Sequence, residues 1–285
     1  MFQPDLLKDQ VILVTGGGTG LGRAMSERFL QLGARVVIAG RRENVLQATA
    51  CEMMGTYGGE VFTIPCDIRD PAAVETMFET IGQRYGTIDV LVNNAAGNFA
   101  SPTERLSHRA VDAVLSIVLH GTIYCTLAAG KRWLAAGRGG RVLSIVTTYA
   151  WTGSAFVMPS AAAKAGVLAM TRSLAVEWGP RGITLNAIAP GPFPTPGAWD
   201  RLVPDQGMQQ TMVDRVPLRR VGRHEELANL AAFLVADQAG YINGEVVTID
   251  GGEWLHGAGQ FNFLERLTPA EWDALAEQGK RAGGK

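Results

Sequence analysis

The sequence predicts an α/β protein of the Rossmann type, a doubly wound, parallel, seven-stranded sheet with helices on both faces. Seven short runs rich in β-branched residues alternate with longer amphipathic stretches, and such alternation produces βαβ crossovers and a parallel sheet. The strand runs are apolar without alternation, as expected for strands that are buried on both faces. The first of these runs leads directly into a glycine-rich turn.

The expected elements follow in chain order, each strand justified by its apolar run and each helix by its amphipathic pattern. The strands are Val11–Thr15, Arg35–Ala39, Val61–Pro65, Val90–Asn93, Arg141–Val146, Thr184–Ala189 and Val246–Ile249. The helical patterns lie near residues 20–32, 43–56, 71–85, 107–136, 158–178 and 223–236. A short helix is also expected after Thr268, which would cap it, with Pro269 at its first position.

A chain of 285 residues is large enough to bury a full core as one unit. We therefore expect residues 1–285 to form a single domain of this fold. The stretch from Pro190 to Pro217 is rich in Pro and Gly and is too long for a simple connection. It predicts a lid-like insertion at about 190–217, and a C-terminal tail follows at about 253–285.

Composition excludes several classes of function. The net charge is -1 and no basic run dominates, so we expect no nucleic-acid partner. The three Cys and four His show no metal-ligand spacing, so we expect no metal site. We see no apolar run long enough to cross a bilayer, no signal peptide and no peroxisomal signal. These observations predict a cytoplasmic protein without membrane insertion.

The turn Gly16–Gly22 follows the first strand and opens the first helix. Glycine permits a tight turn and a close approach of the backbone to a pyrophosphate, and the helix N-terminus supplies free N–H groups. A glycine-rich turn alone is weak evidence and is often an ordinary loop, but the strand–turn–helix context favours a dinucleotide site. The predicted contacts come from Gly16, Gly18, Thr19, Gly20 and Leu21.

The end of the second strand predicts which nicotinamide cofactor binds. An NAD site usually has an acid here, whereas this chain has Arg41 and Arg42, which favours a 2′-phosphate and hence NADPH/NADP+. The alternative is a solvated pair of arginines at a helix start. Asp67, after the third strand, is placed to accept a hydrogen bond from the adenine amino group. Its alternative role is to cap the helix that begins at Pro71, although the spacing is awkward.

Several further segments accompany the glycine-rich turn. With Gly16–Gly22 the set is Asn93–Phe99, Ser101–Ser107, Tyr149–Phe156, Pro159–Lys164, Pro190–Pro192 and Glu226–Leu234. Together these motifs resemble the short-chain dehydrogenase/reductase family, and within it the mitochondrial-type 2,4-dienoyl-CoA reductases. The resemblance spans nearly the whole chain. It implies that Asn94, Ala95, Lys164, Pro190, Gly191 and Pro192 also contact the cofactor.

An ordinary family member carries a catalytic Tyr four residues before the Lys, where this chain has Ser160 before Lys164. A serine hydroxyl is far less acidic than a phenol, so Ser160 is a poor proton donor. The spacing of four keeps both side chains on one helical face. The resemblance implies that both hold the nicotinamide ribose. The alternative for Ser160 is an ordinary surface serine at a helix start.

Tyr149 follows the fifth strand and Asn98 the fourth, so both emerge at the carboxyl edge where open α/β sheets bind ligands. Thr147 occupies the position of the catalytic Ser of the ordinary family. Two neutral donors converging on a thioester oxygen suit a reaction that forms an enolate. The resemblance implies NADPH-dependent reduction of 2,4-dienoyl-CoA to 3-enoyl-CoA in unsaturated fatty acid β-oxidation. The structural alternatives are loop capping by Asn98 and packing by Tyr149.

An acyl-CoA substrate also needs cations for its phosphates. The resemblance implies Arg69 and Arg201 for this role, with Phe99 and Ser107 along the acyl or pantetheine path. For each of these two arginines taken singly, an ordinary solvent-exposed side chain is nearly as good an interpretation. Family members commonly assemble as tetramers, so we expect a homotetramer formed through the helices 107–136 and 158–178 and the C-terminal strand region.

One departure concerns His120, which stands where the ordinary family keeps an Asn that supports the Lys through water. His120 can bond water or a carbonyl, or it can serve helix packing. Two further functions stay open: reduction of a 2-enoyl-CoA or a small carbonyl compound, and NADP(H) binding without turnover.

Overall fold

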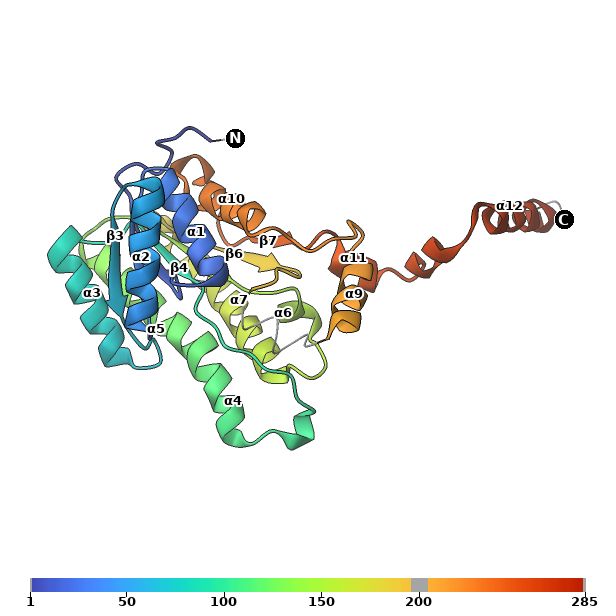
Figure 1. The fold of residues 1–285 in the computed structure, drawn as a ribbon, viewed down its shortest axis with the longest axis horizontal. Coiled ribbons are helices and arrows are strands. Elements are labelled where there is room, and N and C mark those ends of the chain that lie inside the picture. Colours follow the sequence, from blue (N-terminus) through green and yellow to red (C-terminus); the bar gives the residue numbers. More distant parts are fainter. Residues whose placement is uncertain (1, 196–204, 284–285) are drawn as a thin grey trace.

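The computed structural model describes residues 2–195 and 205–283. Seven parallel strands form one sheet in the order β3-β2-β1-β4-β5-β6-β7 (Figure 1), which confirms the predicted fold class. The chain crosses from β3 to β4 past β1 and β2, so the strand order reverses between β1 and β4. Ligand crevices in open α/β sheets form at such a switch point.

The strands agree with the predicted runs to within one residue at each end. They are β1 (Val11–Thr15), β2 (Arg35–Gly40), β3 (Val61–Pro65), β4 (Val90–Asn93), β5 (Gly140–Ile145), β6 (Ile183–Pro190) and β7 (Val246–Ile249). The helices that cover the sheet are α1 (Gly20–Gln31), α2 (Glu43–Tyr57), α3 (Pro71–Tyr85), α4 (His108–Leu115), α5 (Gly121–Ala135), α7 (Met158–Trp178) and α10 (His224–Val235).

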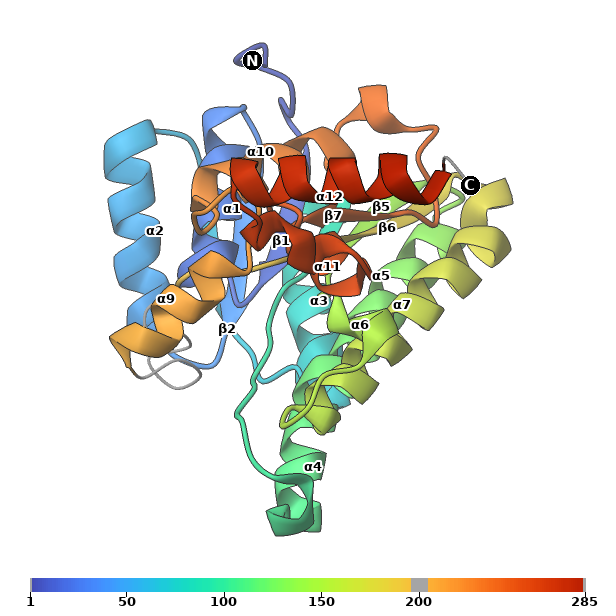
Figure 2. The same cartoon turned by 90° about the vertical axis from the view of Figure 1, so that its right-hand side faces the viewer.

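Two apolar layers sandwich the sheet. One layer joins the sheet to α1, α2 and α10, with Met25, Phe29, Met53 and Leu227 at its centre. The other joins the opposite face to α3, α5 and α7 and contains the fully buried Trp133. Figure 2 shows α1 and α2 on one side of the strands and α5 and α7 on the other. Both faces of the sheet are therefore covered by helices, which leaves its carboxyl edge to carry polar groups.

The helix predicted over 107–136 is interrupted. Between α4 and α5 the stretch Ser116–His120 is π-helical, a deviation found mostly in single turns near functional sites. His120 is exposed at the end of this stretch, and its ring lies 6.2 Å from that of Tyr124.

The whole stretch His108–Ala135 also corrects an expectation about membranes. Its 28 residues are apolar enough, by length and composition, to cross a bilayer, whereas the sequence was expected to hold no such run. Half of its most apolar window is buried inside the protein, and α5 packs in the core layer with α3 and α7. A buried core helix passes the same test of length and composition.

The predicted lid-like stretch and tail contain helices of their own. They are α9 (Gln206–Asp214), α11 (Glu253–Ala258) and α12 (Pro269–Gly283). Thr268 caps α12, because its Oγ1 accepts from the Glu271 N–H at 3.4 Å while its own N–H donates to Glu271 at 2.7 Å. This confirms the capped helix, which has 15 residues rather than being short. Figure 1 shows α12 projecting away from the sheet.

Candidate active site

At the switch point, one threonine at the end of β1 links this strand to the end of β4 by hydrogen bonds. The Thr15 Oγ1 donates to the Val92 carbonyl at 3.3 Å and accepts from the N–H groups of Asn94 and Ala95 at 3.0 and 3.1 Å. The Asn94 side-chain amide in turn donates to the Thr15 and Gly16 carbonyls at 3.0 and 3.3 Å. The predicted contacts Asn94 and Ala95 are thus fixed beside the glycine-rich turn.

The turn after β1 has no room for side chains at two positions. Gly16 has φ +68°, which is the left-handed region that favours glycine. A Cβ on Gly22 would collide with the Gly16 carbonyl and the Asn94 amide. Glycine at these positions lets the turn fold tightly against the segment after β4, a turn geometry that fits a dinucleotide pyrophosphate.

The N-terminus of α1 supplies donors to the same cradle. Thr19 is the N-cap but its side chain makes no capping hydrogen bond, so the first N–H groups of the helix are free for an anion. Thr19 and Gly20 line a groove of about 920 Å³ that also contains Gly18 and Arg42. Leu21 is half-buried and packs into the core layer, so its side chain anchors the turn.

Two guanidiniums stand at the end of β2. Arg41 and Arg42 are exposed, and Arg42 is the N-cap residue of α2. Within residues 2–195 and 205–283 neither side chain forms an ion pair. Both cations are available to an anionic ligand at this edge.

Asp67 and Arg69 bind each other. The Arg69 Nε donates to the two Asp67 carboxylate oxygens at 2.9 and 3.0 Å, and a second guanidinium nitrogen completes the ion pair. This arginine holds the pKa of Asp67 below its usual value. Asp70, not Asp67, caps α3 by accepting from the Ala72 N–H at 2.9 Å. Sequence reasoning placed Asp67 and Arg69 at two different ligands and missed their pairing.

The segment after β6 is anchored to the end of β7. The Gly191 N–H donates to the Ile249 carbonyl at 3.0 Å, and a Cβ on Gly191 would lie 2.6 Å from the Cβ of Asp250. The Pro192 carbonyl accepts from the Gly222 N–H at 3.0 Å. Pro190, Gly191 and Pro192 therefore form a fixed wall at the carboxyl edge.

Tyr149 lies at the centre of the catalytic candidates. It begins the four-residue helix α6 (Tyr149–Thr152), which three residues separate from the end of β5. The Tyr149 hydroxyl lies 3.1 Å from the Ser160 Oγ, and the Asn98 side-chain amide donates to the hydroxyl at 3.4 Å. The predicted convergence of Asn98 and Tyr149 is present, and Ser160 joins them.

Ser160 and Lys164 occupy one face of α7, and both are buried. The Lys164 Nζ donates to the Ile145 carbonyl at the end of β5. Burial lowers the pKa of Lys164 to about 8, because no partner charge compensates the lost hydration. Ser160 is not a surface serine, since it is 2% exposed.

The remaining candidates have simpler surroundings. Phe99 packs in a small apolar cluster with Val114, Val118 and Ala163. Ser107 is the N-cap of α4 and accepts from the Ala110 N–H at 3.2 Å. The Thr147 hydroxyl makes no hydrogen bond within the described residues. Arg201 lies outside the residues that the structure describes. In the described part of the chain, no three His, Cys, Asp or Glu side chains gather as a metal site.

Thr15 is the main residue that sequence reasoning missed. It is the single polar residue of the buried strand β1, and that contrast was the available signal. Trp151 and Trp254, whose rings meet edge to face at 5.8 Å, gave no such signal because they are far apart in the sequence.

Comparison with known proteins agrees with this geometry. The chain is 46% identical over 277 residues to an uncharacterized oxidoreductase of Caenorhabditis elegans, covering 95% of this chain and 88% of the relative. It is 43% identical to a Bacillus subtilis protein named as a probable 2,4-dienoyl-CoA reductase, (2E)-enoyl-CoA-producing, covering 88% and 98%. It is 44% identical to a C. elegans protein named as a probable 2,4-dienoyl-CoA reductase, (3E)-enoyl-CoA-producing, covering 93% and 88%.

Solved structures give the same result. A short chain dehydrogenase of Bacillus anthracis matches with a TM-score of 0.81 at 44% identity, covering 89% of this chain and 100% of that one. A structure from Agrobacterium tumefaciens, described as a 2-deoxy-D-gluconate 3-dehydrogenase with bound NADP, matches with a TM-score of 0.81 at 33% identity over 89% and 100%. The sequence model described as enoyl-(acyl carrier protein) reductase covers residues 16–253. By its sheet order, its glycine-rich turn and these matches, the chain belongs to the short-chain dehydrogenase/reductase family of oxidoreductases.

Proposed function

We propose that this protein uses NADPH to reduce a conjugated acyl-CoA thioester, most specifically a 2,4-dienoyl-CoA to a 3-enoyl-CoA. The observation that carries the proposal is the placement of the Tyr149 hydroxyl, 3.4 Å from the Asn98 amide and 3.1 Å from the Ser160 hydroxyl. The phenol comes from α6, while the position on α7 one turn before Lys164 carries Ser160, whose hydroxyl is a poor proton donor to a simple carbonyl. Relatives named as dienoyl-CoA reductases support this substrate class.

The donors suit a charge that develops on a thioester oxygen. When bound, the reduced nicotinamide would supply the hydride that adds to the δ carbon of the conjugated chain. Tyr149 then donates its O–H to the thioester oxygen, and Asn98 donates a second N–H from an amide that already supports the phenol. Donors that meet the oxygen mainly when it becomes negative lower the barrier selectively. Removing one such donor from a comparable site costs about 10² to 10³ in kcat.

The reaction adds one hydride and one proton to the substrate. Protonation of the resulting dienolate at its α carbon gives the 3-enoyl thioester. Among the described residues, the hydrogen bonds of Tyr149, Asn98 and Ser160 involve no carboxylate, so we propose that solvent supplies this proton. The names of the relatives include both (2E)- and (3E)-enoyl products, which makes the product isomer a direct readout.

The cofactor preference follows from the cations at the end of β2. Arg41 and Arg42 are exposed and form no ion pair in the described chain, so a 2′-phosphate gains cationic contacts there that a bare ribose does not. Structures similar to this chain contain bound NADP, which supports the same choice.

The testing experiment pairs two cofactors with two substrates. NADPH and NADH are each combined with a 2,4-dienoyl-CoA and a 2-enoyl-CoA, on the wild type and on Tyr149→Phe. We expect turnover with NADPH and the dienoyl-CoA, and a loss of about 10²-fold or more in Tyr149→Phe. If Tyr149→Phe keeps full activity on the 2-enoyl-CoA, the alternative reductase is correct. NADPH binding without turnover of any acyl-CoA rejects the enzyme hypothesis.

We also propose a homotetramer assembled through the long helix α4–α5, α7 and the region of β7. Large apolar side chains are exposed on this part of the surface, among them Leu127 on α5 and Val176 on α7. Val176 is 80% exposed on the outer face of α7, and apolar side chains that gather on one face mark interaction sites more often than single ones do.

A further inference from the structure

The helix that carries Tyr149 is too short to hold itself in place. Helix α6 has four residues, Tyr149–Thr152, and isolated helices of this length are unstable in water. The chain from Trp151 to Phe156 is exposed throughout. The position of the Tyr149 hydroxyl therefore depends on the contacts that α6 makes with other parts of the protein.

One such contact joins α6 to the C-terminal segment. The rings of Trp151 on α6 and Trp254 on α11 meet edge to face, with centroids 5.8 Å apart and planes at 86°. This geometry is a favourable arrangement for two aromatic rings. The two helices lie close together in both ribbon views (Figures 1 and 2).

Helix α11 is itself anchored at the end of the sheet. Asp250, directly after β7, is 9% exposed. Its carboxylate accepts from the N–H groups of Gly252 at 2.8 Å and Trp254 at 2.9 Å. Gly191 packs against this aspartate. The backbone that carries Trp254 is thus fixed to the β6–β7 wall of the candidate cofactor site, and the ring contact of its indole is with Trp151.

The other side of the same loop is fixed to the segment of Asn98. The Phe156 carbonyl accepts from the Ser101 N–H at 2.8 Å, three residues beyond Asn98. Phe156 has φ +67°, an uncommon conformation for a large side chain that persists where surroundings impose it. Trp254 therefore holds the beginning of this loop and Ser101 its end.

We infer that Trp254 is a positioning residue for the reaction. Through Trp151 it fixes the orientation of α6, so that the Tyr149 hydroxyl stays between Asn98 and Ser160. This role rests on the proposed function only in that Tyr149 is the donor to the substrate. The inference also gives the C-terminal segment a role in the active site. Among the described residues, this segment forms no hydrogen bond with the side chains of Tyr149 or Asn98.

The first test needs no turnover. Tyrosine labelled with ¹³C at Cζ gives one NMR signal for each of the five tyrosines, and Tyr149→Phe identifies the signal of Tyr149. We expect Trp254→Ala to shift and broaden this signal, while Trp254→Phe, which keeps an aromatic ring, largely restores it. Trp272→Ala is the matched control, because Trp272 lies on α12, far from α6 in Figure 1. An unchanged Tyr149 signal in Trp254→Ala overturns the inference.

The second test separates positioning from general stability. We expect Trp254→Ala and Trp151→Ala each to lower kcat by roughly ten- to hundredfold, with the Kd of NADPH changed by less than about twofold, and the double variant to lose no more than either one. In the Tyr149→Phe background, Trp254→Ala should add nothing. Additive losses, or an equal loss in that background, overturn the inference. If the NMR result holds but no acyl-CoA is turned over, the proposed function fails while the positioning role of Trp254 stands.

Discussion

Asn98 gives the clearest residue-scale prediction, because its amide can serve two acceptors. One N–H supports the Tyr149 oxygen at 3.4 Å, and the Asn98 Oδ1 is occupied by the Phe99 N–H at 2.9 Å. Asn98→Ala should lower kcat by about 10² to 10³ without weakening NADPH binding, as measured by steady-state kinetics and cofactor fluorescence. A rise in KM with unchanged kcat would instead show that Asn98 stabilises the bound substrate and the transition state equally.

Lys164 gives a prediction about pH and stability. Burial lowers its pKa from an ordinary value of 10.5 to about 8, so between these two values the unfolded chain binds more protons than the folded one. The contribution of Lys164 to the free energy of unfolding must therefore rise as pH increases from about 8 to about 10.5, and stay level below about 8.

Lys164→Met tests this, because it keeps the length of the side chain and removes the titration. Both proteins are unfolded with urea, without cofactor, at pH 7, 9 and 10.5. The free energy of unfolding of the wild type should increase relative to that of Lys164→Met between about pH 8 and 10.5, and not below about pH 8. A constant difference at all three pH values would mean that Lys164 keeps an ordinary pKa in the folded protein.

Arg41 and Arg42 give a prediction about cofactor choice. Replacing both by Ala should raise the Kd of NADPH by about tenfold or more, which corresponds to about 1.4 kcal/mol, and leave that of NADH nearly unchanged. Arg181→Ala, an exposed arginine on the short turn after α7, is the matched control. Parallel weakening of both cofactors would mean that the two arginines support the fold of the turn rather than a 2′-phosphate.

At the scale of elements, local patterns were sufficient for the sheet. All seven strands were predictable because β-branched, apolar runs bounded by polar turns leave little alternative. The long helix was predictable but its π-helical stretch Ser116–His120 was not, because apolar periodicity does not register one extra residue in a turn. Helix α6 and the Asp67–Arg69 pair were also not predictable, since they depend on tertiary contacts rather than on local preference.

Helix packing gives a prediction that separates two kinds of glycine. Gly130 lies in the middle of α5, and a Cβ there would collide with the indole of Trp178 at the end of α7. Gly130→Ala should therefore destabilise the protein by about 1–3 kcal/mol. Gly55, in α2, is exposed and has nothing within 4 Å of an added Cβ, so Gly55→Ala should stabilise it by about 0.5–1 kcal/mol. Urea denaturation measures both, and equal effects would refute close α5–α7 contact.

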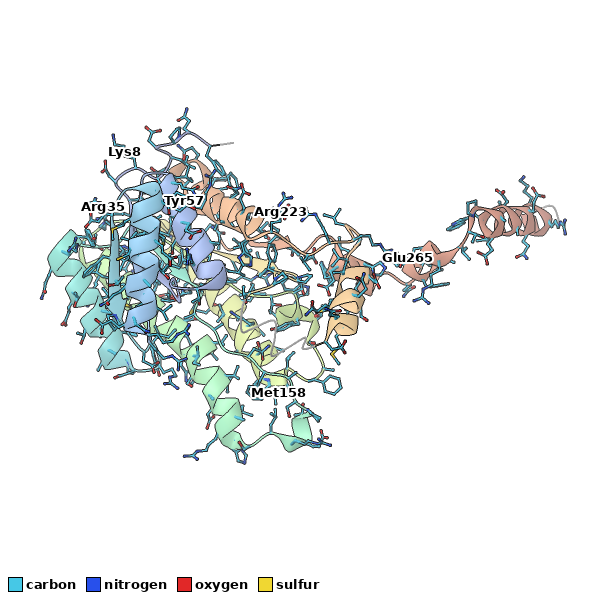
Figure 3. All side chains as sticks on the ribbon, viewed as in Figure 1. Lys8, Arg35, Tyr57, Met158, Arg223 and Glu265 are labelled. Atoms are coloured by element: carbon cyan, nitrogen blue, oxygen red, sulfur yellow. The ribbon has the colours of Figure 1, made fainter. Side chains whose placement is uncertain are left out.

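At the scale of the whole molecule, parallel strands place Thr15, Asn98 and Tyr149, which follow or end different strands, at one edge, and helices cover both faces of the sheet. The loops that follow β1, β2, β4, β5 and β6 all open at this edge. The C-terminal segment begins at this edge too, since the Asp250 carboxylate, directly after β7, accepts from the Gly252 and Trp254 N–H groups. Farther along, Glu265, labelled in Figure 3 near the base of the projecting tail, pairs with Arg219 at 3.3 Å and with His256 at 3.1 Å. The outer surfaces of α5 and α7 carry exposed apolar side chains, among them Leu127 and Val176. Such side chains are expected where another subunit packs.

Val176 tests whether that outer surface is a subunit interface. If α7 packs against a second copy, the exposed side chain of Val176 lies in an apolar contact, and a buried unpaired charge there is strongly unfavourable. Val176→Lys should therefore convert the tetramer to smaller species in light scattering at micromolar concentration. Met54→Lys is the control, because Met54 is also exposed but lies on α2, outside the expected interface. A wild type that is already monomeric, or a tetramer unaffected by Val176→Lys, would place the interface elsewhere.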